Sequence, residues 1–144
     1  MKRKATAVWS GSGKEGKGTL SGPSGVLNQT PYSFAARFAN EDGKAGTNPE
    51  ELLAASHAGC FAMALSFQLG NEGFTPDELH TDAIVTIESV DGGFAITKID
   101  LILKAKIEGI DESKFLEIAN AAKEGCPISK ALSSVDISLK ATLA

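Results

Sequence analysis

The sequence predicts an α+β fold with mostly antiparallel strand pairing, in the order three strands, helix, two strands, helix, strand. Two observations support this prediction. Segments in which apolar and polar residues alternate are separated by glycine-containing turns, and two longer stretches with helix-capping residues lie between groups of these segments. The length of 144 residues suits one domain and no break in composition divides it, so we expect a single domain over residues 1–144.

The first three predicted strands lie near the N-terminus. Residues 5–9 and 17–21 have strand-like patterns and flank the glycine-rich segment 11–16, which predicts a hairpin. In YSFAARF, residues 32–38, large apolar side chains occupy alternate positions and Arg37 lies on the opposite face. This alternation predicts the third strand.

A long central helix is predicted to follow. Asn48 is the expected N-cap, Pro49 takes the first helical position, and Glu51 stands at capping-box spacing from the cap. The helix should run to about residue 69, end at Gly70 and carry Cys60. Its apolar run is nearly long enough to cross a bilayer, but polar residues interrupt it and small side chains dominate it. We therefore expect a buried core helix whose packing a second subunit completes.

The second half predicts two strands, a helix and a final strand. Residues 83–89 and 94–107 read as strands joined by the hairpin turn 91–93. Residues 111–125 predict an amphipathic helix capped by the aspartate at its first position, and residues 135–143 alternate as a last strand.

Composition excludes some classes of partner. The formal net charge is -4, from 18 acidic and 14 basic residues, and such a surface attracts neither nucleic acid nor an anionic membrane. The basic N-terminal residues precede no apolar segment of the kind found in secretory signals, so we expect a cytoplasmic protein.

Two cysteines, Cys60 and Cys126, are the main candidates for reactive residues. A reducing compartment disfavours a structural disulfide, so the thiols are either inert core residues or a redox pair, and we favour the pair. An apolar helix raises the pKa of a thiol, and lowering it by about two units requires roughly 2.7 kcal/mol from a nearby cation. Of the two arginines, Arg37 lies in a predicted strand and Arg3 near a terminus, which makes Arg37 the better candidate. A solvent-facing Arg37 and an inert Cys60 remain the alternative.

Cys126 precedes Pro127, which disfavours helical geometry at the cysteine and predicts that it caps a short helix over PISKAL. A helix N-terminus favours a thiolate. The same Gly-Cys-Pro sequence also suits a simple turn with a small buried residue.

The segments SGVLNQTPYSFAARF, GTNPEELLAASHAGCFAMALSFQLG and GFAITKI, with the later GCP, resemble the osmotically inducible protein C and organic hydroperoxide resistance (OsmC/Ohr) family, most closely its osmotically inducible branch. The resemblance implies an OsmC-like fold, an intertwined homodimer with sites at the interface, and no cofactor or metal. It also implies a thiol-dependent peroxidase that reduces organic hydroperoxides, and hydrogen peroxide less well.

The same resemblance implies roles for four residues. Cys60 matches the peroxidatic cysteine and Cys126 the resolving cysteine, while Arg37 and Glu50 match the arginine and glutamate that activate the thiolate. An external dithiol must reduce the resulting disulfide. A lipoyl-bearing protein is the reductant that the family implies, and small dithiols are the alternative.

Helix geometry supports a shared site. Glu50 and Cys60 lie ten positions apart on one predicted helix, a rise of about 15 Å. A glutamate of the same chain cannot hold an arginine against Cys60 over that distance unless the helix breaks. We therefore expect one subunit's acid to serve the other subunit's thiol.

Three other functions are alternatives to the peroxidase. The two cysteines with His57 and His80 have the number of ligands that zinc requires but not the paired spacing of structural zinc modules. A cysteine hydrolase would need an acid to orient His57, and none is evident, so we interpret His57 as a packed interface histidine. A non-enzymatic, stress-related binding module with inert buried thiols is the remaining alternative.

Overall fold

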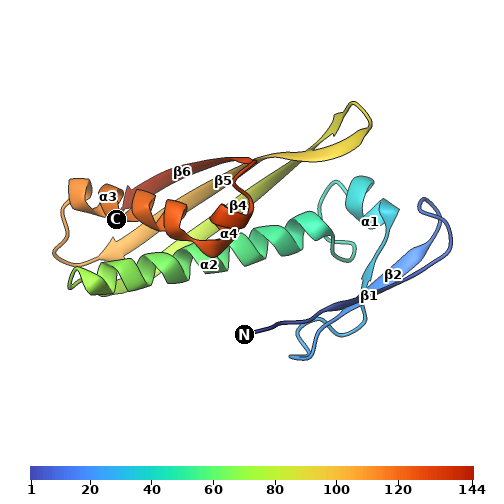
Figure 1. Cartoon of the computed structure of the whole chain (residues 1–144), viewed down its shortest axis with the longest axis horizontal. Helices are drawn as coiled ribbons and strands as arrows, with labels where there is room; N and C mark the ends of the chain where they lie inside the picture. The colour runs from blue at the N-terminus through green and yellow to red at the C-terminus, as the bar shows by residue number, and fades with distance from the viewer. The chain divides into compact units, whose positions relative to one another are not determined.

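The computed structural model describes all 144 residues and divides into two compact units, Met1–Leu52 and Leu53–Ala144 (Figure 1). Each unit is described by itself below.

The first unit contains a three-stranded antiparallel sheet and a short helix. Its strands, β1 (Thr6–Ser10), β2 (Lys17–Ser21) and β3 (Thr30–Tyr32), pair in chain order, and the helix α1 (Phe34–Phe38) follows. The β1–β2 hairpin confirms the prediction for the glycine-rich turn. Gly18 pairs with both Trp9 and Tyr32, and a Cβ there would lie 2.4 Å from the Tyr32 ring, so only glycine lets the two rings approach to 5.3 Å.

The prediction of a strand over residues 32–38 is wrong. Only Tyr32 of this segment belongs to β3, and α1 begins after Ser33, whose Oγ accepts a hydrogen bond from the Ala36 N–H at 3.0 Å. A serine with extended backbone that satisfies an otherwise unpaired N–H is a helix N-cap. The rings of Phe34 and Phe38 lie 5.0 Å apart, one helical turn from each other. Alternation of large residues over so short a segment fits a helix turn as well as a strand.

Helix α2 (Pro49–Asn71) starts in the first unit and continues as the first element of the second. The predicted cap is confirmed, since Asn48 Oδ1 accepts a hydrogen bond from the Glu51 N–H at 2.7 Å. The helix ends one residue beyond the predicted position. Gly73, with φ +85°, follows it and lets the Phe74 N–H reach the Leu69 carbonyl at 2.9 Å.

By length and composition α2 could cross a membrane, a property that core helices of soluble proteins share. One of its faces is a core face. The residues on that face are spaced four apart and are 0% exposed: His57, Phe61, Leu65 and Leu69.

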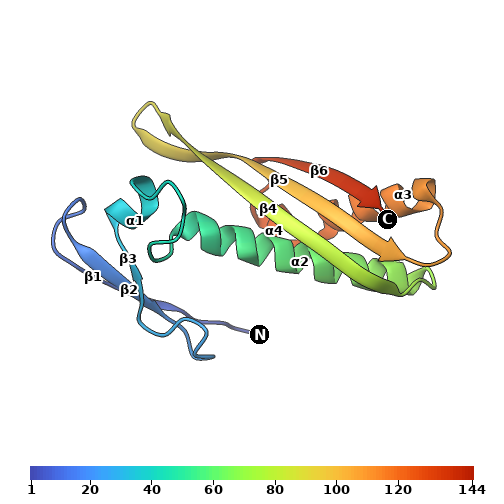
Figure 2. The same cartoon turned by 180° about the vertical axis from the view of Figure 1, so that it is seen from behind.

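The second unit is a three-stranded sheet with helices on one face. Strands β4 (Pro76–Val90) and β5 (Gly93–Ile107) form a long antiparallel hairpin, and β6 (Asp136–Leu143) pairs with β5 in parallel. The chain passes from β5 to β6 through α3 (Glu112–Gly125) and α4 (Pro127–Ala131), the crossover that a parallel pair requires. Figure 2 shows the sheet in front, with α2, α3 and α4 behind it.

The core of the second unit lies between the sheet and these helices. Strand β5 contributes the predicted stripe of alternate residues: Ile99, Leu101, Leu103, Ala105 and Ile107. Helix α3 contributes its inward face: Phe115, Ile118, Ala119 and Ala122. Asp111 caps α3 as predicted, accepting from the Lys114 N–H at 2.9 Å. The opposite face of the sheet carries the Lys98–Asp100 ion pair at 2.9 Å and, across from Asp100, the half-exposed Ile84.

Candidate active site

Arg37 and Glu50 form a bidentate ion pair in the first unit. Arg37 Nη2 lies 2.6 Å from Glu50 Oε1, and Arg37 Nε lies 3.1 Å from Glu50 Oε2. The Glu50 side chain is 11% exposed and the Arg37 side chain 35% exposed. Two parallel charge-assisted hydrogen bonds fix the plane of the guanidinium, and they leave Nη1 to donate elsewhere.

The local structure explains why Glu50 rather than Glu51 holds the arginine. Glu50 is the second residue of α2 and is buried, whereas Glu51 is exposed and accepts a hydrogen bond from Thr47 Oγ1 at 2.7 Å. The guanidinium carbon of Arg37 also lies 4.9 Å from the centre of the Phe38 ring, a cation–π contact. The guanidinium is therefore held both at its edge and on its face.

A small cleft of about 110 Å³ adjoins Arg37 in the first unit. Its lining is mainly aromatic: Trp9, Tyr32, Phe34 and Phe38. An apolar cleft beside a guanidinium can hold an alkyl group while the cation addresses a polar head.

Cys60 and Cys126 meet in the core of the second unit as free thiols. Cys60 lies at mid-length in α2 and is partly buried, while Cys126 is 0% exposed and stands as the N-cap of α4. The capping position was predicted from Pro127. Each thiol affects the ionisation of the other through a hydrogen bond, and the charge of Cys126 also acts on Cys60, so they titrate as a pair.

The two thiols differ in which form their surroundings favour. Burial raises the pKa of the Cys60 thiol; a hydrogen bond from the Ile128 backbone opposes this in part, and the neighbouring Cys126 adds to it. Burial also acts to raise the pKa of Cys126, but the backbone of Ser129, the Cys60 thiol and the Ser129 hydroxyl outweigh it, so that this pKa lies below its ordinary value. No cation is among the groups that shift Cys60. A reactive Cys60 therefore needs a positive group from another source.

His57 lies one helical turn before Cys60, and its Nε2 is 2.8 Å from Ser129 Oγ. The histidine is 0% exposed, Ser129 is 7% exposed, and Nδ1 has no hydrogen-bond partner. Burial lowers the pKa of His57 below 6.5, which keeps the ring neutral. The interpretation of His57 as an interface histidine is wrong, because the side chain is enclosed within a single chain.

No group of three or more histidine, cysteine, aspartate or glutamate side chains with the geometry of a metal site occurs in the structure.

Comparison with known proteins places these features in a family. The family model described as "OsmC-like protein" matches residues 41–140, well over half of the chain. The chain belongs to the OsmC family. This confirms the resemblance inferred from the sequence motifs.

Two relatives illustrate the breadth of the OsmC family. The chain is 54% identical to Peroxiredoxin OsmC of Escherichia coli strain K12 over 130 residues, which covers 90% of this chain and 89% of that protein. It is 34% identical to the organic hydroperoxide resistance protein OhrB of Bacillus subtilis strain 168, covering 85% and 88% of the two chains.

Solved structures confirm the α+β fold as OsmC-like. The crystal structure of OhrB from Bacillus subtilis superposes with a TM-score of 0.70 at 31% identity, covering 96% of this chain and 98% of that chain. The OsmC-like protein from Mycoplasma pneumoniae superposes with a TM-score of 0.77 at 19% identity, covering 100% of this chain and 98% of that one, and shows the fold alone.

In this OsmC-family chain the four residues singled out from the sequence form two pairs. Arg37 meets Glu50 in the first unit, and Cys60 meets Cys126 in the second. Sequence reasoning missed Ser129, whose hydroxyl oxygen lies 2.8 Å from His57 Nε2 and whose backbone and hydroxyl act to lower the pKa of Cys126. The only hint was its position three residues after Cys126, the spacing of one turn at a helix start.

Proposed function

We propose that this OsmC-family protein is a thiol-dependent peroxidase that reduces organic hydroperoxides, with Cys60 as the peroxidatic and Cys126 as the resolving cysteine. The observation that carries the proposal is the meeting of two free, interacting thiols in the core of one unit. The relatives named for peroxiredoxin activity and organic hydroperoxide resistance support it.

The chemistry needs one two-electron oxidation of sulfur. The Cys60 thiolate attacks the terminal peroxide oxygen of ROOH, an S–O bond forms, and the O–O bond breaks. The alkoxide takes a proton to become ROH, and Cys60 is left as a sulfenic acid. Cys126 then displaces hydroxide from that sulfur, which gives a disulfide and water.

Arg37 is the proposed activator of Cys60, and Glu50 is its positioning partner. Because the carboxylate occupies Nε and Nη2 of Arg37, Nη1 can donate to the thiolate and to the peroxide oxygens as negative charge moves onto them. The aromatic cleft beside Arg37 suits the alkyl part of the hydroperoxide.

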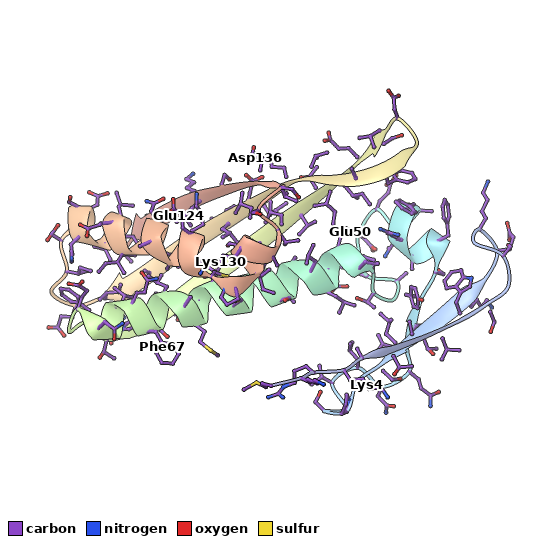
Figure 3. The ribbon with its side chains drawn as sticks, viewed as in Figure 1. Lys4, Glu50, Phe67, Glu124, Lys130 and Asp136 are labelled. Carbon is purple, nitrogen blue, oxygen red and sulfur yellow. The ribbon has the colours of Figure 1, made fainter.

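We propose further that the site is completed in a homodimer, in which Arg37 and Glu50 of one subunit serve Cys60 of the other. Helix α2 is unbroken between Glu50 and Cys60, which supports the sequence argument from helix rise. Two large apolar side chains of α2 also lie open, since Met63 is 64% and Phe67 69% exposed. In Figure 3 Phe67 projects from the side of α2 opposite α3.

Subunit complementation tests the shared site. Cys60→Ser and Arg37→Ala chains are each expected to be inactive as homodimers. After mixing through reversible unfolding, a mixed dimer holds one complete site, so about a quarter of the wild-type rate should return if subunits pair at random. Mixed dimers detected by native mass spectrometry but without activity would place Arg37 and Cys60 of each site in one chain.

The reductant and the location of the protein remain predictions. An external dithiol, with a lipoyl-bearing protein as first candidate, would reopen the disulfide in the cytoplasm. We also propose that both units act together as one functional domain over residues 1–144.

The central experiment follows the oxidation state of each cysteine by mass after one equivalent of an alkyl hydroperoxide. Wild-type protein should lose two hydrogens, Cys126→Ser should gain oxygen at Cys60, and Cys60→Ser should not react. Prior alkylation of the thiols should abolish peroxide turnover. An undiminished peroxidase rate in Cys60→Ser would contradict the proposal and favour a binding module with inert thiols.

A further inference from the structure

His57 is a fully buried titratable side chain that the proposed mechanism does not use. It is 0% exposed, and its one hydrogen bond joins Nε2 to Ser129 Oγ at 2.8 Å across 72 positions of sequence. Its other ring nitrogen, Nδ1, is buried without a partner. Burying a polar atom without a hydrogen bond costs free energy, and the cost depends on whether the atom carries a proton. The unpaired Nδ1 therefore indicates which ring nitrogen is protonated.

The missing partner of Nδ1 selects one tautomer of the neutral ring. With the proton on Nδ1, a buried N–H would have no acceptor, whereas with the proton on Nε2 only a lone pair is left unpaired. Buried N–H donors without acceptors are rarer than buried acceptors without donors. The assigned arrangement is therefore Nε2–H donating to Ser129 Oγ.

This direction of donation determines what the Ser129 hydroxyl can do. Its oxygen already accepts from His57, so its hydrogen is free to donate to a third group. Cys126 stands three residues earlier at the start of α4, and the Ser129 backbone and hydroxyl are among the groups that stabilise its thiolate. The Cys126 side chain makes no capping hydrogen bond with the first turn of α4. A thiolate at this position would gain from a hydroxyl donor one helical turn away, and Ser129 carries such a hydroxyl.

We propose that His57 and Ser129 are positioning residues for the resolving thiol: His57 Nε2–H donates to Ser129 Oγ, and this turns the Ser129 O–H toward Sγ of Cys126. The proposal rests on the proposed function. It adds two hydrogen-bond donors in series, His57 Nε2–H and Ser129 O–H, to the step in which Cys126 closes the disulfide. The His57–Ser129 hydrogen bond therefore joins α2, which carries Cys60, to α4, which Cys126 caps.

The step that these two donors assist is disulfide closure. The Cys126 thiolate attacks sulfur of the Cys60 sulfenic acid, the S–S bond forms, and the S–O bond breaks. The departing hydroxide takes up a proton equivalent to the one that Cys126 released, so the net products are a disulfide and one water. Neither His57 nor Ser129 changes its covalent state or its net charge.

The expected size of the effect follows from two opposing factors. Loss of a hydrogen bond to an ionised group changes the thiolate fraction about tenfold, equivalent to a rise of about one unit in the pKa of Cys126. A more basic thiolate is a better nucleophile, which offsets about threefold of that loss. Below the pKa of the thiol, disulfide closure should therefore slow about threefold.

Rapid quenching with alkylation and mass analysis separates the two steps in Ser129→Ala, Ser129→Thr and the control Ser133→Ala, whose serine is exposed. Ser129→Ala should form the Cys60 sulfenic acid at the wild-type rate and close the disulfide about threefold more slowly, while Ser129→Thr and the control close normally. Alkylation of Cys126 against pH, in a Cys60→Ser background, should show its pKa raised by Ser129→Ala. Unchanged closure and unchanged pKa in Ser129→Ala would overturn the proposal, even if the variant were less stable.

Two further measurements do not depend on that variant. His57→Gln keeps an N–H donor and should close the disulfide faster than His57→Leu; equal rates would overturn the proposal. Nitrogen NMR of the wild-type ring should show Nε2 protonated and Nδ1 bare, and the opposite tautomer would break the donor chain. If peroxide fails to oxidise wild-type Cys60, the proposed function fails, whereas the alkylation profile and the tautomer still decide this inference.

Discussion

Replacing Glu50 by glutamine tests the activation of Cys60 most directly. The variant keeps the size of the side chain but exchanges one carboxylate oxygen for an amide NH₂. Glu50 uses both oxygens, at 2.6 Å to Arg37 Nη2 and 3.1 Å to Arg37 Nε, so one guanidinium N–H would face another donor. Because the Glu50 side chain is only 11% exposed, water cannot readily replace the lost acceptor.

The magnitude follows from the free energy of the lost contact. A hydrogen bond to a charged group contributes about 1.5–3 kcal/mol net. If that energy holds the guanidinium in the orientation that the transition state needs, its loss slows Cys60 oxidation about 10- to 100-fold. The cost in folding stability is smaller, about 1 kcal/mol, because the Arg37 side chain is 35% exposed and solvent can screen its charge.

The assay is the single-turnover rate of Cys60 oxidation by an alkyl hydroperoxide, with Glu51→Gln as the matched control. Glu51 is the adjacent acid, is exposed, and bonds Thr47 at 2.7 Å rather than the arginine. It should retain nearly the full rate. Equal rates for Glu50→Gln and Glu51→Gln would refute the role of the ion pair in activation.

Three other predictions concern assembly, core and pH. Phe67→Glu should yield monomers by light scattering and lose most peroxidase activity, because it places a charge on the open apolar face of α2, while Leu116→Glu on α3 should leave the dimer intact. Phe61→Ala should lower the free energy of unfolding by about 3–5 kcal/mol in urea titrations, since the ring is 0% exposed. Because burial lowers the pKa of His57 below 6.5, the unfolded chain binds more protons just below that pH, and stability should fall as pH decreases through it. His57→Gln should flatten this part of the stability–pH curve; an unchanged slope would contradict the assignment of a neutral buried ring.

The elements that the sequence predicted correctly are those whose sequence patterns lie within the element itself. Asn48 caps α2 and Asp111 caps α3 through side-chain oxygens that reach backbone N–H groups three residues on. The buried stripe of β5 occupies five alternate positions from Ile99 to Ile107, enough repeats for its period of two to exclude a helix.

The failures occur where local signals were ambiguous or the partners lie far apart in sequence. Phe34 and Phe38 are four positions apart, which fits alternate strand positions and one helical turn equally, so only the Ser33 cap decides between them. The contact of His57 with Ser129 spans 72 positions and depends on how α4 packs against α2. Local periodicity contains no information about such a contact, so a buried polar pair of this kind emerges only from the fold.

The ion pair also determines what kind of help Arg37 can give to a thiolate. A guanidinium already paired with a carboxylate has almost no net charge at a distance, so its field falls off quickly. Burial has made the Cys60 thiol more basic, and lowering its pKa by two units needs roughly 2.7 kcal/mol. One charge-assisted hydrogen bond can supply that energy, but only at contact distance. Under the proposed mechanism, activation therefore depends on the direction and reach of Arg37 Nη1 more than on the sign of its charge. A lysine, with a compact and strongly hydrated charge on a flexible stem, would keep that sign and lose the planar fork that Glu50 and Phe38 hold in place.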